Sequence, residues 1–86
     1  MNKGDIVLNK YAGENNPCRI SIITYIGKVH INVLYEQKGA LKKAQYFTRD
    51  LKTDKEHFVI IGHLDYEKVI REKLRELKRG ADNGND

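Results

Sequence analysis

The chain is poor in several residue types that define protein classes. In 86 residues it has one cysteine, one proline, no tryptophan and only two phenylalanines. A single cysteine excludes an internal disulfide, which fits a reducing compartment. It also excludes the sets of several cysteines that are typical of structural zinc sites. With so few large aromatic residues, the core must be built mainly from isoleucine, valine and leucine.

Long apolar runs are also absent. No segment approaches the roughly 20 consecutive apolar residues of a membrane-spanning helix. The opening MNKGDIVLNK lacks the apolar stretch that is typical of a signal peptide. We therefore expect a cytoplasmic protein.

Charge is plentiful and unevenly spread. One third of the residues are charged and the net charge is +4, in a chain that is 40% hydrophobic. This composition indicates one globular domain near the lower size limit for independent folding. The excess is concentrated in residues 38–55, which hold six basic and two acidic side chains. A basic surface suits an acidic partner, above all nucleic acid.

Residues 1–64 have the pattern of short β-strands separated by turns. Glycine supplies the tight turns at Gly27-Lys28 and at Gln37-Lys38-Gly39, because it accepts the positive φ that hairpins need. Residues 49–57 form a charged connection with a helical turn. The predicted strands are IVL (6–8), CRISIITYI (18–26), VHINVLYE (29–36), LKKAQYFT (41–48) and FVIIGHL (58–64).

The alternation of side chains predicts which of them face the core. In the second strand one set of alternate residues is almost wholly apolar, and in the third strand the apolar and polar residues alternate. The apolar fifth strand suggests a central or barrel-closing position. The predicted inward residues are Cys18, Ile20, Ile22, Thr24 and Ile26 of the second strand, and Val29, Ile31, Val33 and Tyr35 of the third.

After Leu64 the apolar period changes from two residues to about 3.6. Asp65 is a good N-cap residue, so we predict a helix over residues 65–79, with Gly80 as its C-terminal cap. Residues 80–86 are small and polar, and we expect a disordered tail there. The helix carries one apolar stripe, formed by Tyr66, Ile70, Leu74 and Leu77.

Five short strands in direct succession favour a strongly bent sheet that closes on itself. A flat sheet of this size would expose both edges and one apolar face. We therefore expect a mainly β domain over residues 1–79, namely a five-stranded SH3-like barrel followed by a C-terminal α-helix. The helix can either plug one end of the barrel or lie outside it, and both alternatives are open at this point.

Several stretches resemble known small barrels. The opening GDIVLNKYAGENNPCRI is similar to the start of SH3-like and KOW-like barrels. The wider order GDIV, AGENNPCR, KKAQYF and FVIIGHLD resembles small proteins that phages and integrated elements of Gram-positive bacteria carry. The resemblance covers residues 4 to about 70. It implies an SH3-like fold, a mobile-element origin and location in the host cell cytoplasm.

The residues that could carry catalysis are scattered. Nucleophilic catalysis requires a base beside the nucleophile. Cys18 falls on the face that we assign to the core, where cysteine acts as a small hydrophobe. His30, His57 and His63 have no neighbour at a recognised catalytic spacing, and the sequence has no CxxC, HxxxH or phosphate-binding glycine loop. We expect no enzyme activity, no metal and no cofactor.

The predicted fourth strand and its continuation, LKKAQYFTR, mix cations with aromatic rings. Lysine and arginine contact phosphates while ring faces stack on bases, which holds single strands without a base code. The alternative is an edge strand whose lysines prevent aggregation of sheets. The residues that we predict to bind a partner here are Lys42, Lys43, Tyr46 and Arg49.

The segment YAGENNPCR is the second candidate site. Asn16-Pro17 is a typical turn starter, because proline restricts the residue before it. Gly13 is expected to take a backbone conformation that other residues avoid, so loop shape explains Gly13, Asn16 and Pro17 without any function. It does not explain Tyr11, Glu14 or Arg19, and we predict that these three residues, together with Tyr25, contact a partner.

The helix offers a third surface. Its mixed charges at i,i+4 spacing are typical of a solvated face. If its apolar stripe does not pack on the barrel, the stripe becomes a surface for a second copy or for another partner.

From these features we expect a non-enzymatic binding module of a phage or mobile element that contacts nucleic acid or a nucleic-acid-handling protein. A competing hypothesis is an inhibitor of a host defence nuclease, similar to anti-CRISPR proteins, that acts by binding protein. The basic charge counts against mimicry of DNA, although not against protein binding elsewhere. A third hypothesis is a small structural or assembly protein that forms homodimers through the helix.

Overall fold

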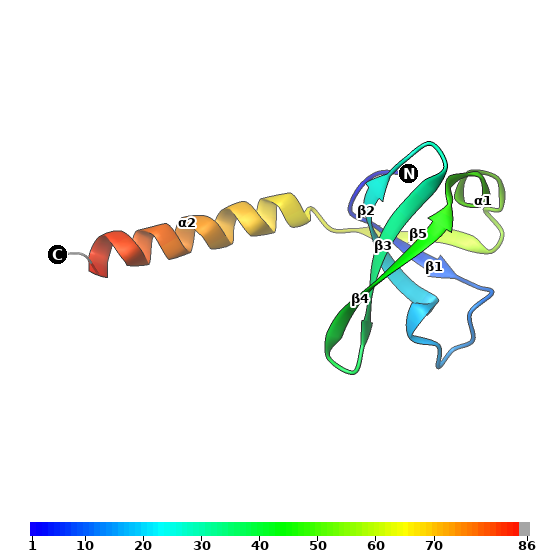
Figure 1. Ribbon diagram of the computed structural model, residues 1–86, viewed down its shortest axis with the longest axis horizontal. Coiled ribbons are helices and arrows are strands. Elements are labelled where there is room, and N and C mark those ends of the chain that lie inside the picture. Colours follow the sequence, from blue (N-terminus) through cyan, green and yellow to red (C-terminus); the bar gives the residue numbers. More distant parts are fainter. Residues whose placement is uncertain (85–86) are drawn as a thin grey trace.

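The computed structural model describes residues 1–84 (Figure 1). Five antiparallel strands form one sheet in the order β4-β3-β2-β1-β5. The mainly β class with a C-terminal helix is therefore confirmed. No strand pairing joins β4 to β5 in the described residues, so the sheet is open. The elements are β1 (Asp5–Asn9), the 3-10 helix η1 (Pro17–Arg19), β2 (Ile20–Ile26), β3 (His30–Gln37), β4 (Ala40–Phe47), α1 (Thr48–Thr53), β5 (Phe58–His63) and α2 (Tyr66–Gly84).

The core lies on one face of the sheet, which we call the inner face. The four largest fully buried side chains come from β1, β2 and β3, and α1 adds Leu51 to them. These aliphatic side chains meet the expectation of a core without large aromatic anchors. The fully buried residues are Val7, Ile23, Ile31 and Val33, and Ile26, Ala44, Tyr46 and Phe58 pack against them.

The inner face of β2 is the opposite of the one that we predicted. Ser21 and Ile23 are buried, whereas Ile20 is 52% exposed. Cys18 lies in η1, before the strand begins, and is not a core residue of β2. Isoleucine occurs on both faces of this strand, so alternation alone cannot distinguish them. The pairing with β1 distinguishes the two faces, because Ser21 lies opposite the buried Val7.

The expectation for β3 is met in its centre. Ile31 and Val33 are buried as predicted, but Val29 precedes the strand and is exposed. The β2–β3 pairing shifts register between Ile23 and Tyr25. This irregularity changes the side-chain parity of β2, so Ile26 packs against the core.

The two hairpin turns use glycine for different reasons. At the β3–β4 turn, Lys38 and Gly39 both have positive φ, at 52° and 80°, as a tight two-residue hairpin requires. The turn after β2 is different, since Gly27 is not among the positive-φ residues. A Cβ atom on Gly27 would lie 2.9 Å from the carbonyl oxygen of His30. Close approach of the backbone, and not φ, requires glycine at position 27.

Helix α2 begins where the sequence predicts. The backbone N–H of Lys68 donates to Oδ1 of Asp65 at 3.0 Å, which is an N-cap. The helix continues to Gly84, five residues beyond the expected end at Arg79. Residues 85–86 of the expected tail lie outside the described residues.

Among the side chains that the structure describes, the first turn of α2 fastens the helix to the rest of the chain. The hydroxyl of Tyr66 donates to the carbonyl oxygen of Thr24 at 3.2 Å, and Lys3 Nζ lies 2.8 Å from Glu67 Oε1. Beyond this turn the helix projects away from the strands (Figure 1), and the molecule measures 56 × 29 × 19 Å. Of the two alternatives for the helix, it therefore lies outside the sheet. Within residues 1–84, no helix is both long and apolar enough to cross a bilayer.

Candidate functional site

Strand alternation divides the cluster predicted on β4 between the two faces of the sheet. Lys42 and Tyr46 have the same parity as Ala44, which packs on the core. Lys43 has the opposite parity and points to the other face, which we call the outer face. The four predicted residues of this segment therefore do not form one patch.

Tyr46 belongs to the core. Its ring packs against the buried aliphatic residues and lies 5.3 Å from the ring of Phe58. Its hydroxyl donates to the carbonyl oxygen of Cys18 at 3.4 Å, and Asn9 Nδ2 donates to the same hydroxyl at 3.4 Å. These contacts give the ring and the hydroxyl of Tyr46 a structural role on the inner face.

Phe47 is the exposed aromatic residue of β4. It is 52% exposed on the outer face, directly opposite the exposed His30 of β3. The two ring centroids are 5.2 Å apart, with an angle of 32° between the ring planes. Sequence reasoning noted Phe47 among the aromatic residues of this segment but chose Tyr46 as the binding residue, and it missed His30. Strand alternation could have identified Phe47, because it lies four residues after Lys43 and therefore on the same face of β4, whereas Tyr46 lies on the other face.

Two further cross-strand pairs continue this surface. Gln45 Nε2 donates to Asn32 Oδ1 at 2.9 Å, and Lys43 lies opposite Leu34. Aromatic, amide and basic side chains therefore follow one another along the same two strands. We call this surface the β3–β4 outer face. It consists of His30, Asn32, Leu34, Lys43, Gln45 and Phe47.

The β3–β4 outer face is hollowed beside its amide pair. A cavity of about 470 Å³ opens there, and Asn32, Lys43 and Gln45 are among its lining residues, together with Thr24 of β2. Within residues 1–84, the amide nitrogen of Asn32 and the amide oxygen of Gln45 have no hydrogen-bond partner. The hollow is therefore lined by two amide side chains and one cation.

The other cations of this segment remain accessible. Lys42 is exposed on β4, which is an edge strand. Arg49 is exposed at the start of α1, with Nε 3.5 Å from Asp50 Oδ1. Lys42 therefore adds a cation on the inner-face side of this edge strand, and Arg49 adds one at the start of α1.

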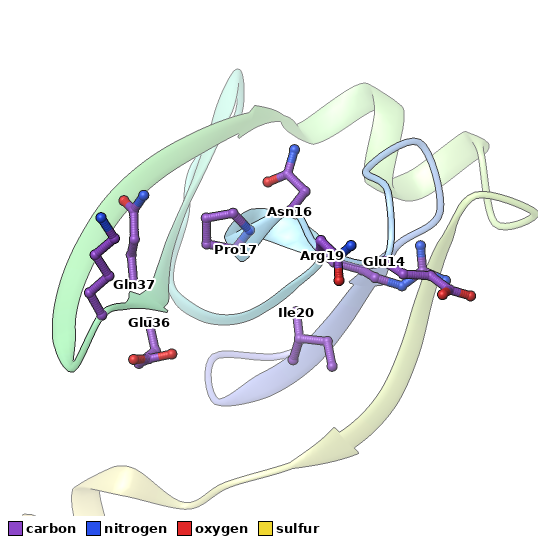
Figure 2. A pocket seen from close by; sticks show the side chains of 9 residues that line it. Glu14, Asn16, Pro17, Arg19, Ile20, Glu36 and Gln37 are labelled. Carbon is purple, nitrogen blue, oxygen red and sulfur yellow. The ribbon is translucent and has the colours of Figure 1, made fainter.

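The loop after β1 forms a separate groove with the β3–β4 turn (Figure 2). Asn16 caps η1 by accepting a hydrogen bond from the backbone N–H of Cys18 at 2.9 Å, which confirms that Asn16-Pro17 shapes the loop. The groove has a volume of about 650 Å³. It is lined by Glu14, Asn15, Asn16, Pro17, Arg19, Ile20, Glu36, Gln37 and Lys38.

The charges of this groove are balanced. Glu14 and Glu36 supply two carboxylates, and Arg19 and Lys38 supply two cations. Arg19 is half-buried, and its Nη1 donates to the carbonyl oxygen of Ala12 at 2.6 Å, so it also braces the loop. A groove of balanced charge has no general attraction for phosphates. The structure brings Glu14 and Arg19 together, but not in a basic site.

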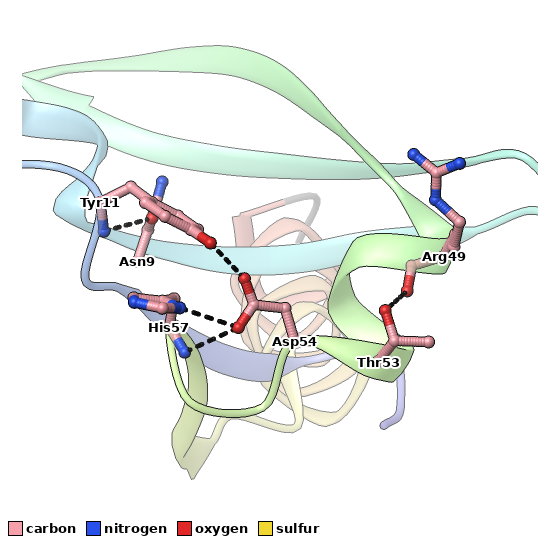
Figure 3. Close-up of polar contacts among 6 residues, drawn as sticks. All are labelled: Asn9, Tyr11, Arg49, Thr53, Asp54 and His57. Atoms are coloured by element: carbon pink, nitrogen blue, oxygen red, sulfur yellow. Dashed lines mark hydrogen bonds and ion pairs between the residues drawn. The ribbon is translucent and has the colours of Figure 1, made fainter.

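Tyr11 has a structural partner that the sequence did not indicate (Figure 3). Its ring stacks on His57, with centroids 4.3 Å apart, and its hydroxyl donates to Asp54 Oδ2. His57 Nδ1 lies 2.9 Å from Asp54 Oδ1. The cluster ties the loop after β1 to the connection between α1 and β5. Because these contacts join segments more than 40 residues apart, no local pattern could reveal them.

The same hydrogen bonds shift the acidity of this cluster. The hydroxyl of Tyr11, followed by the ring of His57, stabilises the carboxylate of Asp54 and lowers its pKa. The carboxylate in turn raises the pKa of Tyr11. Asp54 is therefore a charged acceptor that is already engaged within the chain.

Tyr25, the last predicted contact residue, is exposed near the end of β2 beside Gly27. Two of the histidines, His57 and His63, lie beside a carboxylate, and His63 Nδ1 is 2.8 Å from Asp5 Oδ1. In the part of the chain that the structure describes, no three side chains of His, Cys, Asp or Glu are arranged to hold a metal ion.

The β3–β4 outer face is thus the surface that combines exposed rings, free amide groups and accessible cations. No protein-family model matches the chain, and comparison with curated proteins and with solved structures also gave no match.

Proposed function

We propose that the chain is a non-enzymatic binding module that holds single-stranded nucleic acid on the β3–β4 outer face. The observation that supports this function best is the exposed pair of Phe47 and His30 in line with the Asn32–Gln45 amide pair and Lys43. Each of these groups has a chemical counterpart in a nucleotide.

In this proposal the exposed cations contact the phosphates of the bound strand. Residues 38–55 hold six basic and two acidic side chains. Lys42, Lys43 and Arg49 of this segment are exposed along β4 and the start of α1. Each phosphate that a cation neutralises releases counterions, so the affinity must fall as salt rises.

In this proposal the bases of the strand stack on the aromatic pair. A half-exposed phenylalanine ring on a strand is a stacking surface that accepts any base, since every base has a π face. His30 lies beside Phe47 and extends this surface across the two strands. Stacking on such rings contributes about 1–3 kcal/mol per base.

In this proposal the two amide side chains form hydrogen bonds with base edges. The free amide nitrogen of Asn32 is a donor, and the free amide oxygen of Gln45 is an acceptor. Unstacked bases present such donors and acceptors in single strands, where side chains can reach them. The hollow beside these amides offers room for one base edge.

We further propose that the sheet belongs to the SH3-like class that small phage and mobile-element proteins contain, with its two edge strands, β4 and β5, unpaired within residues 1–84. The strand order, the short α1 before the last strand and the pairing of β5 with β1 support this class. Folds of this kind place diverse functions on their strand faces, so the function rests on the surface residues and not on the fold.

The test is fluorescence anisotropy with labelled single-stranded DNA and RNA oligonucleotides at low and moderate salt. We expect binding that weakens at least tenfold between about 50 and 200 mM salt. The double variant Lys42→Glu/Lys43→Glu should abolish it. The matched control, Arg75→Glu/Arg79→Glu on α2, makes the same charge change away from the site and should retain binding. Absence of any affinity at low salt rejects this function.

A second candidate function is inhibition of a host defence nuclease by binding protein. The observation that favours it is the groove after β1, whose balanced charges suit a polar peptide segment better than phosphates. Capture of a nuclease from host lysate by the wild-type chain, lost on Glu14→Lys and retained in Lys42→Glu/Lys43→Glu, would support this candidate. The reverse pattern would count against it.

A further inference from the structure

Helix α2 carries an apolar stripe that no other part of residues 1–80 covers. Every side chain from Glu67 to Gly80 is exposed. The apolar residues of the stripe are 51–58% exposed, although such residues normally pack against a core. In proteins, most of the stability of a helix comes from packing of its apolar face. The exposed residues are Val69, Ile70, Leu74 and Leu77.

The helix is held away from its own sheet. The backbone N–H of Leu64 donates to the carbonyl oxygen of Gly4 at 2.8 Å, and Tyr66 is anchored on Thr24. Lys3 lies 5.3 Å from the centroid of the Tyr66 ring. These contacts direct the helix outward (Figure 1). The radius of gyration is 16.3 Å, against about 12 Å for a compact domain of this length. The stripe therefore needs a partner from another molecule.

The sheet of the same chain has an apolar patch on its outer face. Ile6 of β1 lies opposite Ile22 of β2, and Leu8 lies opposite both Ile20 of β2 and Val59 of β5. Ile20 is 52% exposed, and the other four residues are half-buried. Helix α1 packs on the inner face through Leu51, and α2 projects away. We call these five side chains the β1–β2 patch.

The dimensions of the stripe and the patch agree. An α-helix is about 10 Å wide, which is the width of two neighbouring strands about 4.8 Å apart. From Val69 to Leu77 the stripe rises about 12 Å, and the five-residue strand β1 is roughly 17 Å long. One helix therefore fits along β1 and β2, and it leaves the β3–β4 outer face open.

Charge does not favour pairing of the stripe with the stripe of a second α2. Both flanks of the stripe carry the two signs, because Glu67 precedes Arg71 by four residues and Lys73 Nζ lies 3.7 Å from Glu76 Oε2. The β1–β2 patch consists only of aliphatic residues, so it matches the apolar stripe in chemistry.

We propose that two copies of the chain form a symmetric dimer in which each α2 lies on the β1–β2 patch of the other copy. One two-fold axis relates the two contacts, so the assembly closes without leaving a free stripe or patch. Two reciprocal contacts bury more surface than one helix pair and approach the roughly 1,200–2,000 Å² of stable interfaces. The inference is independent of the proposed function, because it uses a different surface.

The test is sedimentation velocity of the full chain between about 1 and 100 µM, a range in which a specific interface of this size is populated. We expect a species of twice the mass of one chain. Leu74→Glu in the stripe and Ile20→Glu in the patch should each raise the dimer dissociation constant at least tenfold. The control Arg75→Gln makes the same charge change on the other side of α2 and should remain dimeric.

A monomeric wild-type chain at the highest concentration overturns the proposal. So does a dimer that Leu74→Glu disrupts while Ile20→Glu leaves it intact, because that result assigns the contact to helix pairing. Far-ultraviolet circular dichroism shows whether each variant folds. If Ile20→Glu does not fold, the milder Ile20→Ser makes the same comparison, with the same expected loss of dimer.

Discussion

The sheet and helix α2 are stabilised in opposite ways. The sheet depends on contacts between residues far apart in the chain, such as Val7 with Ile23 and Leu51 in one buried cluster. Helix α2 depends on local hydrogen bonds, and beyond its first turn its side chains are exposed. The buried contacts of the sheet therefore provide most of the stability of the single chain, whereas α2 presents an exposed apolar stripe.

The largest expected effect separates these two regions directly. Ile23→Ala creates a cavity in the buried cluster and should lower the free energy of unfolding by about 2–5 kcal/mol. Leu74→Ala removes a half-exposed side chain and should cost less than about 0.5 kcal/mol at concentrations where the chain is monomeric. Urea denaturation measures both. Equal losses at the two positions would contradict the division between sheet and helix.

The next effect separates the two aromatic neighbours on β4. Phe47→Ala should weaken binding of single-stranded nucleic acid by about 1–3 kcal/mol, because a stacking surface is lost. Tyr46→Phe should leave the affinity unchanged and lower the free energy of unfolding by roughly 0.5–1.5 kcal/mol, because the hydroxyl loses its hydrogen bonds. Anisotropy and urea denaturation measure the two quantities. If Tyr46→Phe weakens binding more than Phe47→Ala, the assignment of faces is wrong.

A smaller effect concerns the clusters that fasten loops to the sheet. Burial disfavours the charged form of Asp5, but hydrogen bonds from the backbone of Asn2 and from His63 outweigh it and lower the pKa of Asp5. The pKa of Asp54 is lowered by Tyr11 and His57. A lowered carboxyl pKa gives stability that is present at neutral pH and is lost as the pH falls through the folded-state value.

The stability of the chain should therefore decrease as the pH falls below about 4. Tyr11→Phe removes the largest cause of the shift, so it should raise the pKa of Asp54 and leave that of Asp5 unchanged. Carbon-detected NMR titration of the carboxyl groups measures both values. An unchanged Asp54 titration in Tyr11→Phe would show that the hydroxyl does not hold this carboxylate.

The smallest effect tests the corrected face of β2. The hydroxyl of Ser21 is buried and has no hydrogen-bond partner within residues 1–84. Ser21→Ala should therefore be neutral or should raise the free energy of unfolding by up to about 1 kcal/mol. Ile20→Ala, on the exposed side, should change it little. A clear loss of stability in Ser21→Ala would indicate a polar contact for this hydroxyl.

Local rules were sufficient for most of the element order. The Asp65 N-cap and the Lys38-Gly39 turn depend on neighbouring residues, and both are as the sequence predicts. The face of β2 was not predictable, because isoleucine occupies both sides and only its pairing with β1 and β3 selects between them. To predict which face of a strand is buried, its partner strand must be known, whereas caps and turns can be predicted from neighbouring residues alone.

The candidate site follows the same division. The basic character of β4 was evident from the sequence, and Lys43 lies on the surface that we propose to bind nucleic acid. His30 could not be assigned to it, because its contact with Phe47 depends on the β3–β4 register. The stacking of Tyr11 on His57 was equally hidden, since it joins two distant loops.

Binding of single-stranded nucleic acid on the β3–β4 outer face is tested most directly by an NMR titration of the isotope-labelled chain with an unlabelled single-stranded oligonucleotide at low salt. We expect chemical-shift changes concentrated at His30, Asn32, Lys43, Gln45 and Phe47, with little change at Glu14 or along α2. Changes centred on the groove after β1, or no changes at all, would contradict it.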